Sequence, residues 1–320
     1  MRSRLRVILL LLPALGVAPA AQGAGYPEKP VSIIVSVGPG TGPDVIARIL
    51  AERFAAAWGQ QVLIVNRPGG GGVIAAQAAA MANPDGYTLY MPVSSLFTVV
   101  PESKTKIPVD VATDFTLIGL VGDQPMVIAA APRLGVNALQ DFIAYARQRP
   151  EEVLYGASRL SVPHMTGELL QIRAGIRMGY VPTPGVAKVL QDIMSDNLSV
   201  AIESMPGLAG AVQAGSVKPL AVASDRRLPA YPDLPLVSET LPGFVATGWF
   251  ALMAPAKTPE DVTSRLEADL RAVLEDAELH KKFEQIGTSP RPMSAAEATR
   301  FIHAEQDLWR PVVRQIGVEW

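Results

Sequence analysis

The chain has 320 residues, of which 49% are hydrophobic and 18% are charged, a composition typical of a folded globular protein rather than a disordered one. Its formal net charge is −2 and its Lys and Arg residues are scattered, so nucleic acid is not expected as a partner. The chain contains no cysteine, which excludes disulfides, thiolate metal sites and a thiol nucleophile.

The N-terminal segment has the three parts of a secretory signal peptide. Three arginines precede the apolar run VILLLLPALGV, and the small residues APAAQGAG follow it. The apolar run is shorter than the roughly 20 residues that a transmembrane helix needs, so we expect cleavage instead of permanent anchoring. Residues 1–24 are therefore predicted to be a signal peptide that is removed near Ala20 to Ala24, which leaves a soluble periplasmic protein.

Short apolar runs alternate with helical patterns from residue 25 to residue 124. A strand, a glycine-rich loop and a helix follow one another twice, and this order predicts a parallel sheet covered by helices. We assign the segment to the first part of a lobe, lobe I. Its expected strands are VSIIVSV at 31–37, QVLIV at 61–65 and YTLYMPV at 87–93, and its expected helices cover 44–59 and 73–83.

A second series of the same kind occupies residues 125–246 and is long enough to form its own lobe, lobe II. A further strand, GWFALMAP, and two or three helices follow within 247–320, and we place them back on lobe I. The sequence thus predicts an α/β protein of two lobes joined by two crossings, with a hinge and a ligand cleft between the lobes. The expected strands of lobe II are MVIAAA, VLYGAS, GYV, LSVAIES and KPLAVAS, with helices over 137–149, before Gly175 and over 186–195.

Two glycine-rich loops lie between a strand and a helix in lobe I: VGPGTGPD at 37–44 and NRPGGGG at 66–72. Backbone N–H groups at a helix start suit an anion, and two such loops on neighbouring strands can bind one carboxylate together. The alternative is that both are tight turns that use glycine for positive φ. Neither loop fits a phosphate-binding motif, because Val73 follows the second loop where a P-loop has lysine, and the first has GxGxG spacing.

A few polar residues stand at positions where they can act. Asp44 is expected to cap the first helix and to pair with Arg48, or else to contact ligand directly or through water. His164 and Glu168 have the spacing of a helical metal pair, but one pair is weak evidence, and we expect a structural or ligand-facing histidine. Glu203 ends an apolar strand. It is either a carboxylate whose hydrogen bonds are all made within the protein at the strand end, or a residue of the cleft.

Catalytic motifs do not stand out in the chain. No Ser-His-acid set is evident and no GxSxG elbow occurs. We therefore expect no enzyme, no cofactor and no metal ion, and an exported hydrolase is the least favoured reading.

Several ordered segments resemble one family over essentially the whole mature chain. They include YPEKPVSIIVSVGPGTGPDVIARIL, NRPGGGGVIAA, NPDGYTL, PHMTGELLQIRAG and GWFALMAPAKTPEDVTSRL. With these segments the chain resembles the substrate-binding proteins of tripartite tricarboxylate transporters, the Bug or TctC-like family of extracytoplasmic receptors. The resemblance implies a two-lobed periplasmic-binding-protein fold of type II, the Venus-flytrap fold, with a carboxylate ligand held largely by backbone groups and ordered water.

The resemblance also implies which residues contact the ligand. Asp44 is kept as a further candidate beside them. From lobe I they are Pro39, Gly40, Thr41, Gly69, Gly70, Gly71 and Ser94, and from lobe II they are Ser158, Ser161, His164, Thr183 and Glu203.

The chain departs from the family pattern in lobe II. Arg159 and Leu160 stand where the family usually has a glycine-rich run before its histidine, and Thr183 begins a Thr-Pro-Gly where it usually reads Tyr-Lys-Gly. The lobe II side chains that would decide which acid is accepted are therefore expected to differ from those of the family. Arg159 is either the partner of a second carboxylate of a diacid or an exposed loop arginine.

The expected function is that of a monomeric periplasmic receptor that closes on a small organic acid and delivers it to the membrane subunits of a tripartite transporter. The alternative partner is a sensor protein that reads the closed, ligand-bound receptor.

Overall fold

The computed structural model describes residues 25–102 and 107–317, so the predicted signal peptide lies outside the described residues. Within them the strands form a ten-stranded sheet in the order β2-β1-β3-β9-β4-β7-β5-β6, with β8 and β10 also paired to β4. The strands are β1 (Val31–Val35), β2 (Val62–Asn66), β3 (Thr88–Met91), β4 (Phe115–Ala130), β5 (Leu154–Ala157), β6 (Gly179–Pro182), β7 (Val200–Ser204), β8 (Lys218–Val222), β9 (Thr247–Pro255) and β10 (Ser289–Pro290). The α-helices are α1 (Gly42–Trp58), α2 (Val73–Ala80), α3 (Ser95–Thr98), α4 (Val111–Asp114), α5 (Leu139–Gln148), α6 (Val162–Ala174), α7 (Val186–Met194), α8 (Met205–Gln213), α9 (Glu260–Leu274), α10 (Ala277–Gln285) and α11 (Ala295–Ile316).

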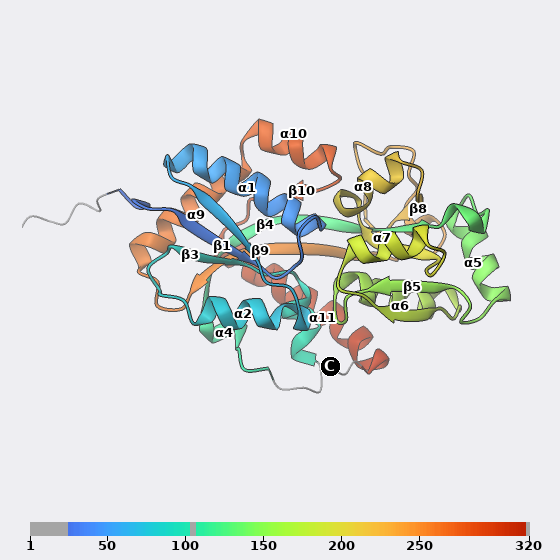
Figure 1. Cartoon of the computed structure of the whole chain (residues 1–320). Helices are drawn as coiled ribbons and strands as arrows, with labels where there is room; N and C mark the ends of the chain where they lie inside the picture. The colour runs from blue at the N-terminus through green and yellow to red at the C-terminus, as the bar shows by residue number, and fades with distance from the viewer. Residues whose placement is uncertain (1–24, 103–106, 318–320) are drawn as a thin grey trace, which may run out of the picture.

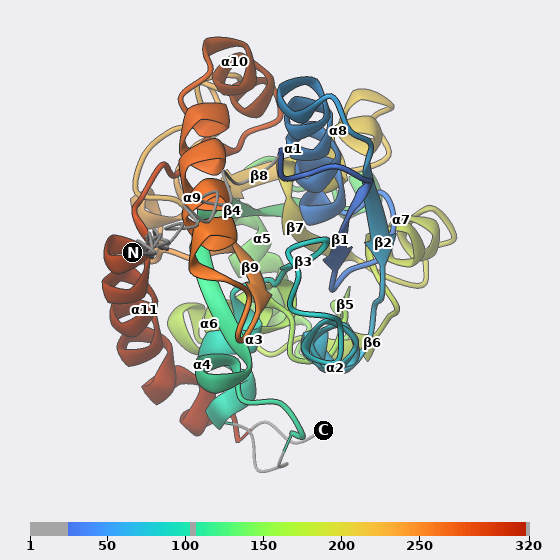
Figure 2. The ribbon, with the colours of Figure 1, turned by 90° about the vertical axis from the view of Figure 1, so that its left-hand side faces the viewer.

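Lobe I is built on the parallel strands β1, β2 and β3, with β9 antiparallel at the side of β3. Successive residues of β1 point to opposite faces, so Ile33 belongs to a core under α1, α9 and α10, whereas Ile34 belongs to a core under α2 and α11. Figure 2 shows this lobe with α9 and α11 toward the left and β2 toward the right. The strand and helix order predicted for 25–124 is confirmed.

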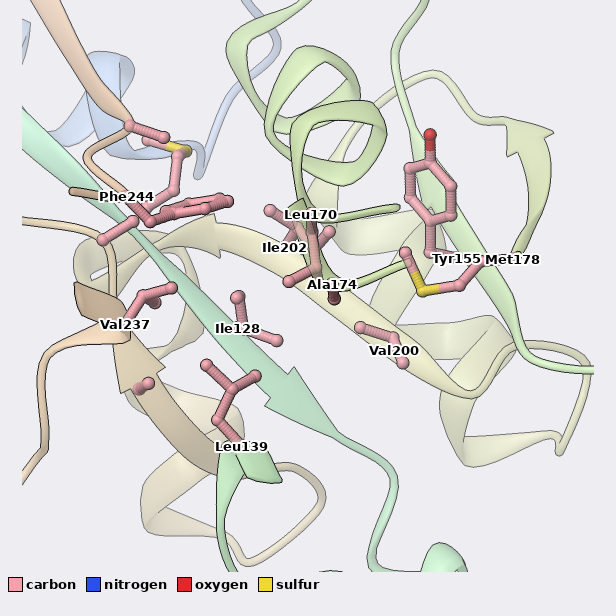
Figure 3. Packing of buried hydrophobic residues seen from close by; sticks show 14 of the residues in the cluster. Ile128, Leu139, Tyr155, Leu170, Ala174, Met178, Val200, Ile202, Val237 and Phe244 are labelled. Atoms are coloured by element: carbon pink, nitrogen blue, oxygen red, sulfur yellow. The ribbon is translucent and has the colours of Figure 1, made fainter. Parts of the chain in front are cut away.

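Lobe II has the same construction around β5, β6 and β7, with β4 and β8 completing its part of the sheet. Ile128 of β4 packs with α5 and α6, and the adjacent Val127 packs with α7 and α8 on the other face. Figure 3 shows the first of these cores, where Ile128, Leu139 and Leu170 converge. The helix α8 was not predicted, because its sequence MPGLAGAVQ contains a proline and two glycines.

The strand β4 joins the two lobes. Its first part, Phe115 to Pro125, pairs with β9, and its last part pairs with β7 and β8. In this ladder Gln124 lies opposite Gly248 and Pro125 lies opposite Thr247, so the two crossings expected from the sequence run side by side. Figure 1 shows β4 and β9 extending along the middle of the molecule from one lobe toward the other.

The helix α11 contacts both lobes. Ala298 and Ile302 in its first half belong to a core of lobe I, whereas Trp309 and Val313 in its second half belong to the core that contains Ile128 of lobe II. The C-terminal helices therefore include one that bridges the lobes. The division of the chain at residues 124/125 and 246/247 stays a prediction.

Candidate functional site

A cavity of about 460 Å³ lies between the two lobes, within the size range of small-molecule sites. Its walls are the loops that follow the carboxyl ends of the parallel strands in each lobe, and its floor includes Gln124 of β4 and Gly248 of β9. The carboxyl ends of such strands are where open α/β sheets bind ligands. The apolar lining residues are Val37, Val93, Met126, Val162, Val186, Val189, Ile202 and Phe250.

The second glycine-rich loop forms part of the lobe I wall. Gly69, Gly70, Gly71 and Gly72 all line the cavity and all have positive φ, from 57° to 119°. A run of four residues in this region requires glycine, because each L side chain there would be strained. The buried Tyr90 of β3 holds the end of the loop by donating a hydrogen bond of 3.2 Å from its hydroxyl to the carbonyl of Gly72.

The first glycine-rich loop reaches Thr41, which occupies the N-cap position of α1 without a capping hydrogen bond from its side chain and lines the cavity. Its Oγ1 donates to the carbonyl of Gly38 at 2.8 Å. The helix then starts with Gly42 and Pro43, and a proline in the first turn is favoured because its missing N–H would have no helical partner there.

Asp44 holds the two loops together from behind. Its carboxylate accepts from the N–H of Gly40 at 2.9 Å, from Arg48 at 3.0 Å and from Asn66 at 2.8 Å. Burial alone would raise the pKa of Asp44, but the hydrogen bonds from Arg48, Asn66 and Gly40 outweigh burial and leave the pKa below its ordinary value. Asp44 is therefore ionised at neutral pH.

The prediction that Asp44 caps the helix is wrong. The cap is Thr41, and Asp44 lies in the first turn, reaching back to the N–H of Gly40. The helix begins earlier than the periodic apolar pattern does, which is why the pattern placed its start too late. The predicted ion pair with Arg48 is confirmed, at 3.0 Å.

Buried hydroxyls complete the lobe I wall. Ser94 and Ser95 follow β3, line the cavity and are 3% and 0% exposed. The N–H of Ser94 donates to the carbonyl of Trp249 at 3.0 Å, which fixes the loop to β9. The hydroxyl of Ser95 has no hydrogen-bond partner among the described residues, so it is available to a bound ligand.

In lobe II the loop after β5 is shaped by serines. Ser158, Arg159 and Ser161 line the cavity. Ser161 caps α6, and its Oγ donates to the carbonyl of Ser158 at 2.7 Å. Leu160 has a φ of 62°, a strained value for leucine, and its fully buried side chain lies in the lobe II core.

His164 supports this loop from inside the lobe. It is 6% exposed, its ring stacks on Tyr180 with centroids 4.0 Å apart, and its Nδ1 accepts from the N–H of Leu160 at 3.2 Å. Burial, with a smaller contribution from the charge of Arg159, lowers the pKa of His164 to about 4. His164 is therefore neutral at physiological pH and is not among the residues that line the cavity.

Thr183 and Glu203 are the remaining lobe II residues of the predicted set, and both line the cavity. The N–H of Thr183 donates to the carbonyl of Ala157 at 3.0 Å, whereas its hydroxyl has no partner among the described residues. The Oε1 atom of Glu203 accepts from the N–H of Ser204 at 2.8 Å and from the Ser204 hydroxyl at 3.0 Å. Burial raises the pKa of Glu203.

The cavity wall thus contains most of the predicted site residues but not all. Asp44 and His164 lie behind the loops that they support, and Pro39 and Gly40 are exposed outside the lining. Ser36, Ser95 and Gln124 also line the cavity but were not predicted, although each stands next to a predicted loop, site residue or crossing. The predicted site residues that do line the cavity are Thr41, Gly69, Gly70, Gly71, Ser94, Ser158, Ser161, Thr183 and Glu203.

His164 and Glu168 approach each other to 3.9 Å, but no third ligand joins them. Over residues 25–102 and 107–317 no group of three or more His, Cys, Asp or Glu side chains is arranged to hold a metal ion. In the same ranges every helix is too short or too polar to span a bilayer.

Residues 46–318 match the family described as "Tripartite tricarboxylate transporter family receptor". The chain belongs to this family of receptors. The receptor is 33% identical over 318 residues to the protein BugT of Bordetella pertussis, a match that covers 98% of each chain. The predicted resemblance is confirmed.

Solved structures agree with the assignment. The receptor superposes on the structure described as "R. palustris Rpa4515 with adipate". The TM-score is 0.88, the identity is 31%, and the match covers 92% of this chain and 99% of that one. It superposes on the periplasmic binding protein BugD with a TM-score of 0.85 and 28% identity, covering 92% and 99%. It superposes on MatC from Rhodopseudomonas palustris with bound malate with a TM-score of 0.82 and 26% identity, covering 90% and 100%. The predicted two-lobed periplasmic-binding-protein fold is confirmed.

Proposed function

We propose that the mature receptor binds a small organic carboxylate in the periplasm and delivers it to the membrane subunits of a tripartite transporter, without changing it chemically. The observation that carries the proposal is the cavity between the lobes, where two glycine-rich loops and buried hydroxyls of lobe I form one wall that has no charged side chain. Such a wall binds an anion through N–H and O–H donors and leaves no strong cation to hold it permanently.

The chemistry of the relatives supports a carboxylate. The similar structures Rpa4515 and MatC are described with adipate and malate, which are both carboxylates. The many apolar lining residues of the present cavity, such as Val189 and Phe250, favour an acid with an apolar portion between its polar groups.

The paired crossings of β4 and β9 support a hinge. We propose that the lobes comprise residues 25–124 with 247–320 and residues 125–246, and that they rotate about Gln124 and Thr247, which lie on paired strands. Ligand contacts both walls only in the closed form, so binding favours closure. Small-angle scattering on the mature monomer should show compaction at saturating ligand, and an unchanged radius would contradict a hinged receptor.

A thermal-shift screen of the mature protein against mono-, di- and tricarboxylates tests the ligand class. A ligand that binds only the folded state raises the unfolding temperature by mass action. We expect a concentration-dependent rise for at least one carboxylate and none for its methyl ester or amide. If no carboxylate stabilises the protein, or if the esters stabilise it equally, the proposal is wrong.

A further inference from the structure

Two charged side chains are found among the lining residues of the cavity, Arg159 and Glu203. Arg159 is an exposed residue of the loop after β5. Glu203, in contrast, stands at the carboxyl end of β7, where burial raises the pKa of its carboxyl group. An acidic residue inside a site for an anion is unexpected, because like charges repel strongly where water is excluded.

Glu203 lines the cavity, and the two oxygens of its carboxyl group differ in their hydrogen bonds. Its Oε1 accepts both donors of Ser204, and its Oε2 accepts no hydrogen bond from a described residue. Only burial and the two hydrogen bonds from Ser204 shift the pKa of Glu203, and no charged side chain contributes to the shift. The Cγ of Glu203 packs against Gly207. A Cβ added at Gly207 would lie 2.8 Å from this Cγ, so a larger residue there would clash with the Glu203 side chain.

Apolar side chains make up much of the lobe II wall on which Glu203 lies. Val186, Val189 and Ile202 line the same side of the cavity, and Val186 also lies close to Gly207. An acidic group in such surroundings is costly unless a donor or a cation meets it. Because no described residue donates a hydrogen bond to Oε2, this oxygen can accept one from a ligand when the lobes close.

We propose that Glu203 selects ligands that carry a cationic amine on the part that faces lobe II, so that the receptor binds an amino-substituted carboxylic acid in preference to a diacid. The proposal rests on the proposed function, since the carboxylate of the same ligand occupies the glycine-rich wall of lobe I. The amine donates to Oε2 and neutralises the charge of the carboxylate, whereas a second carboxylate meets a like charge.

Isothermal titration with matched acids tests this selection. At each of several chain lengths, four straight-chain acids are compared whose far end is an amine, a hydroxyl, a methyl or a second carboxylate. We expect the amine-ended acid of the best length to bind at least about tenfold more tightly than the diacid of that length, with the hydroxyl between them.

The variant Glu203→Gln should remove this preference. We expect its affinity for the amine-ended acid to fall at least about tenfold, its affinity for the diacid to rise, and its affinity for the methyl-ended acid to stay the same. Glu152→Gln is the matched control, because it removes the same charge from an exposed position of lobe II and should alter none of these affinities.

The outcomes separate the two proposals. If the wild-type receptor binds the diacid as tightly as the amine-ended acid, or if Glu203→Gln leaves the ranking unchanged, the role of Glu203 is wrong while carboxylate binding stands. If none of the acids binds, the proposed function fails and the inference fails with it. The ranking in the wild-type protein decides the matter even if Glu203→Gln does not fold.

Discussion

The wall from lobe I and the wall from lobe II face the same cavity but are built from different parts of the chain. Lobe I presents glycines and small hydroxyls whose positions follow from backbone geometry, including four successive glycines with positive φ. Lobe II presents Arg159, Thr183 and Glu203, whose effects depend on the side chain itself. Under the proposed function, lobe I would provide the anion contact and lobe II would decide which acid is accepted.

The most severe test of this comparison is Gly70→Asp. Aspartate tolerates the φ of 57° at this position better than most residues, so the fold should persist. Its carboxylate would occupy the wall proposed to hold the ligand, and we expect affinity to fall by at least about 100-fold. Gly70→Asn adds the same bulk without the charge and should lose less. If Gly70→Asp has a native circular dichroism spectrum and binds ligand with wild-type affinity, the loop is an ordinary turn and not an anion site.

Between pH 6.5 and 4, lobe II should contribute to the acid sensitivity of folding through His164. His164 has a folded-state pKa of about 4, below the ordinary value of 6.5, so between these pH values the unfolded chain takes up a proton that the folded protein does not. Stability should therefore be unaffected by this group above pH 6.5 and decrease as the pH falls toward 4, by up to about 3 kcal/mol. Denaturant unfolding across this range measures the loss.

His164→Gln separates this effect from that of other titrating groups. The variant should unfold with a shallower dependence on pH between 6.5 and 4, although it loses the stacking on Tyr180 and is less stable throughout. An identical pH dependence in both proteins would mean that His164 is protonated in the folded state.

Closure of the two walls should be sensitive to Gly42. A Cβ added at this first residue of α1 would lie 2.3 Å from Oγ of Ser204 in lobe II and 2.5 Å from Oε1 of Gln124. Gly42→Ala should therefore keep the lobes apart and weaken binding by about tenfold. Gly210→Ala is the control, because a Cβ at that helical position meets no atom within 4 Å. Equal affinity and equal compaction in both variants would exclude this contact as a condition of closure.

Thr183 provides a smaller test on the lobe II side. Its hydroxyl is buried and has no hydrogen-bond partner in the part of the chain that the structure describes, so Thr183→Val should leave the ligand-free protein as stable or more stable, by about 1 kcal/mol. If the hydroxyl binds ligand, affinity should fall by about fivefold, and Thr183→Ser should retain most of it. Unchanged affinity in the valine variant would remove Thr183 from the site.

The smallest effect on binding is expected from Asp44→Asn. Asparagine keeps one oxygen acceptor but places an amide group among the donors Arg48 and Asn66, so stability should fall by about 1–2 kcal/mol. Because Asp44 supports the loops from behind, affinity should change by no more than about threefold once the protein is folded. A loss comparable with that of Gly70→Asp would place Asp44 in contact with ligand.

Some elements could be predicted from the sequence because their signals are local. The strand of Ile33 and Ile34 and the helix that ends at Gly59 were found in order, since period and glycine stop signals need no distant partner. The full length of β4 was not predicted, because Gly119, Gly122 and Pro125 interrupt its pattern. Pairing with β9 and β10 maintains the strand through these positions, and at Gly122 a Cβ would lie 2.8 Å from the carbonyl of Ser289.

The candidate site divides in the same way. The sequence by itself determined the two glycine-rich loops, because four adjacent glycines before a helix restrict the backbone whatever surrounds them. Only the tertiary structure decided that His164 turns into lobe II to stack on Tyr180, while Glu203 lines the cavity and only its Oε1 accepts hydrogen bonds from described residues. Both residues are polar and lie beside a strand end or a helix start, so their local patterns are alike. What separates them is which neighbours the packing of distant strands and helices places around each side chain, and burial of a polar group depends on those neighbours.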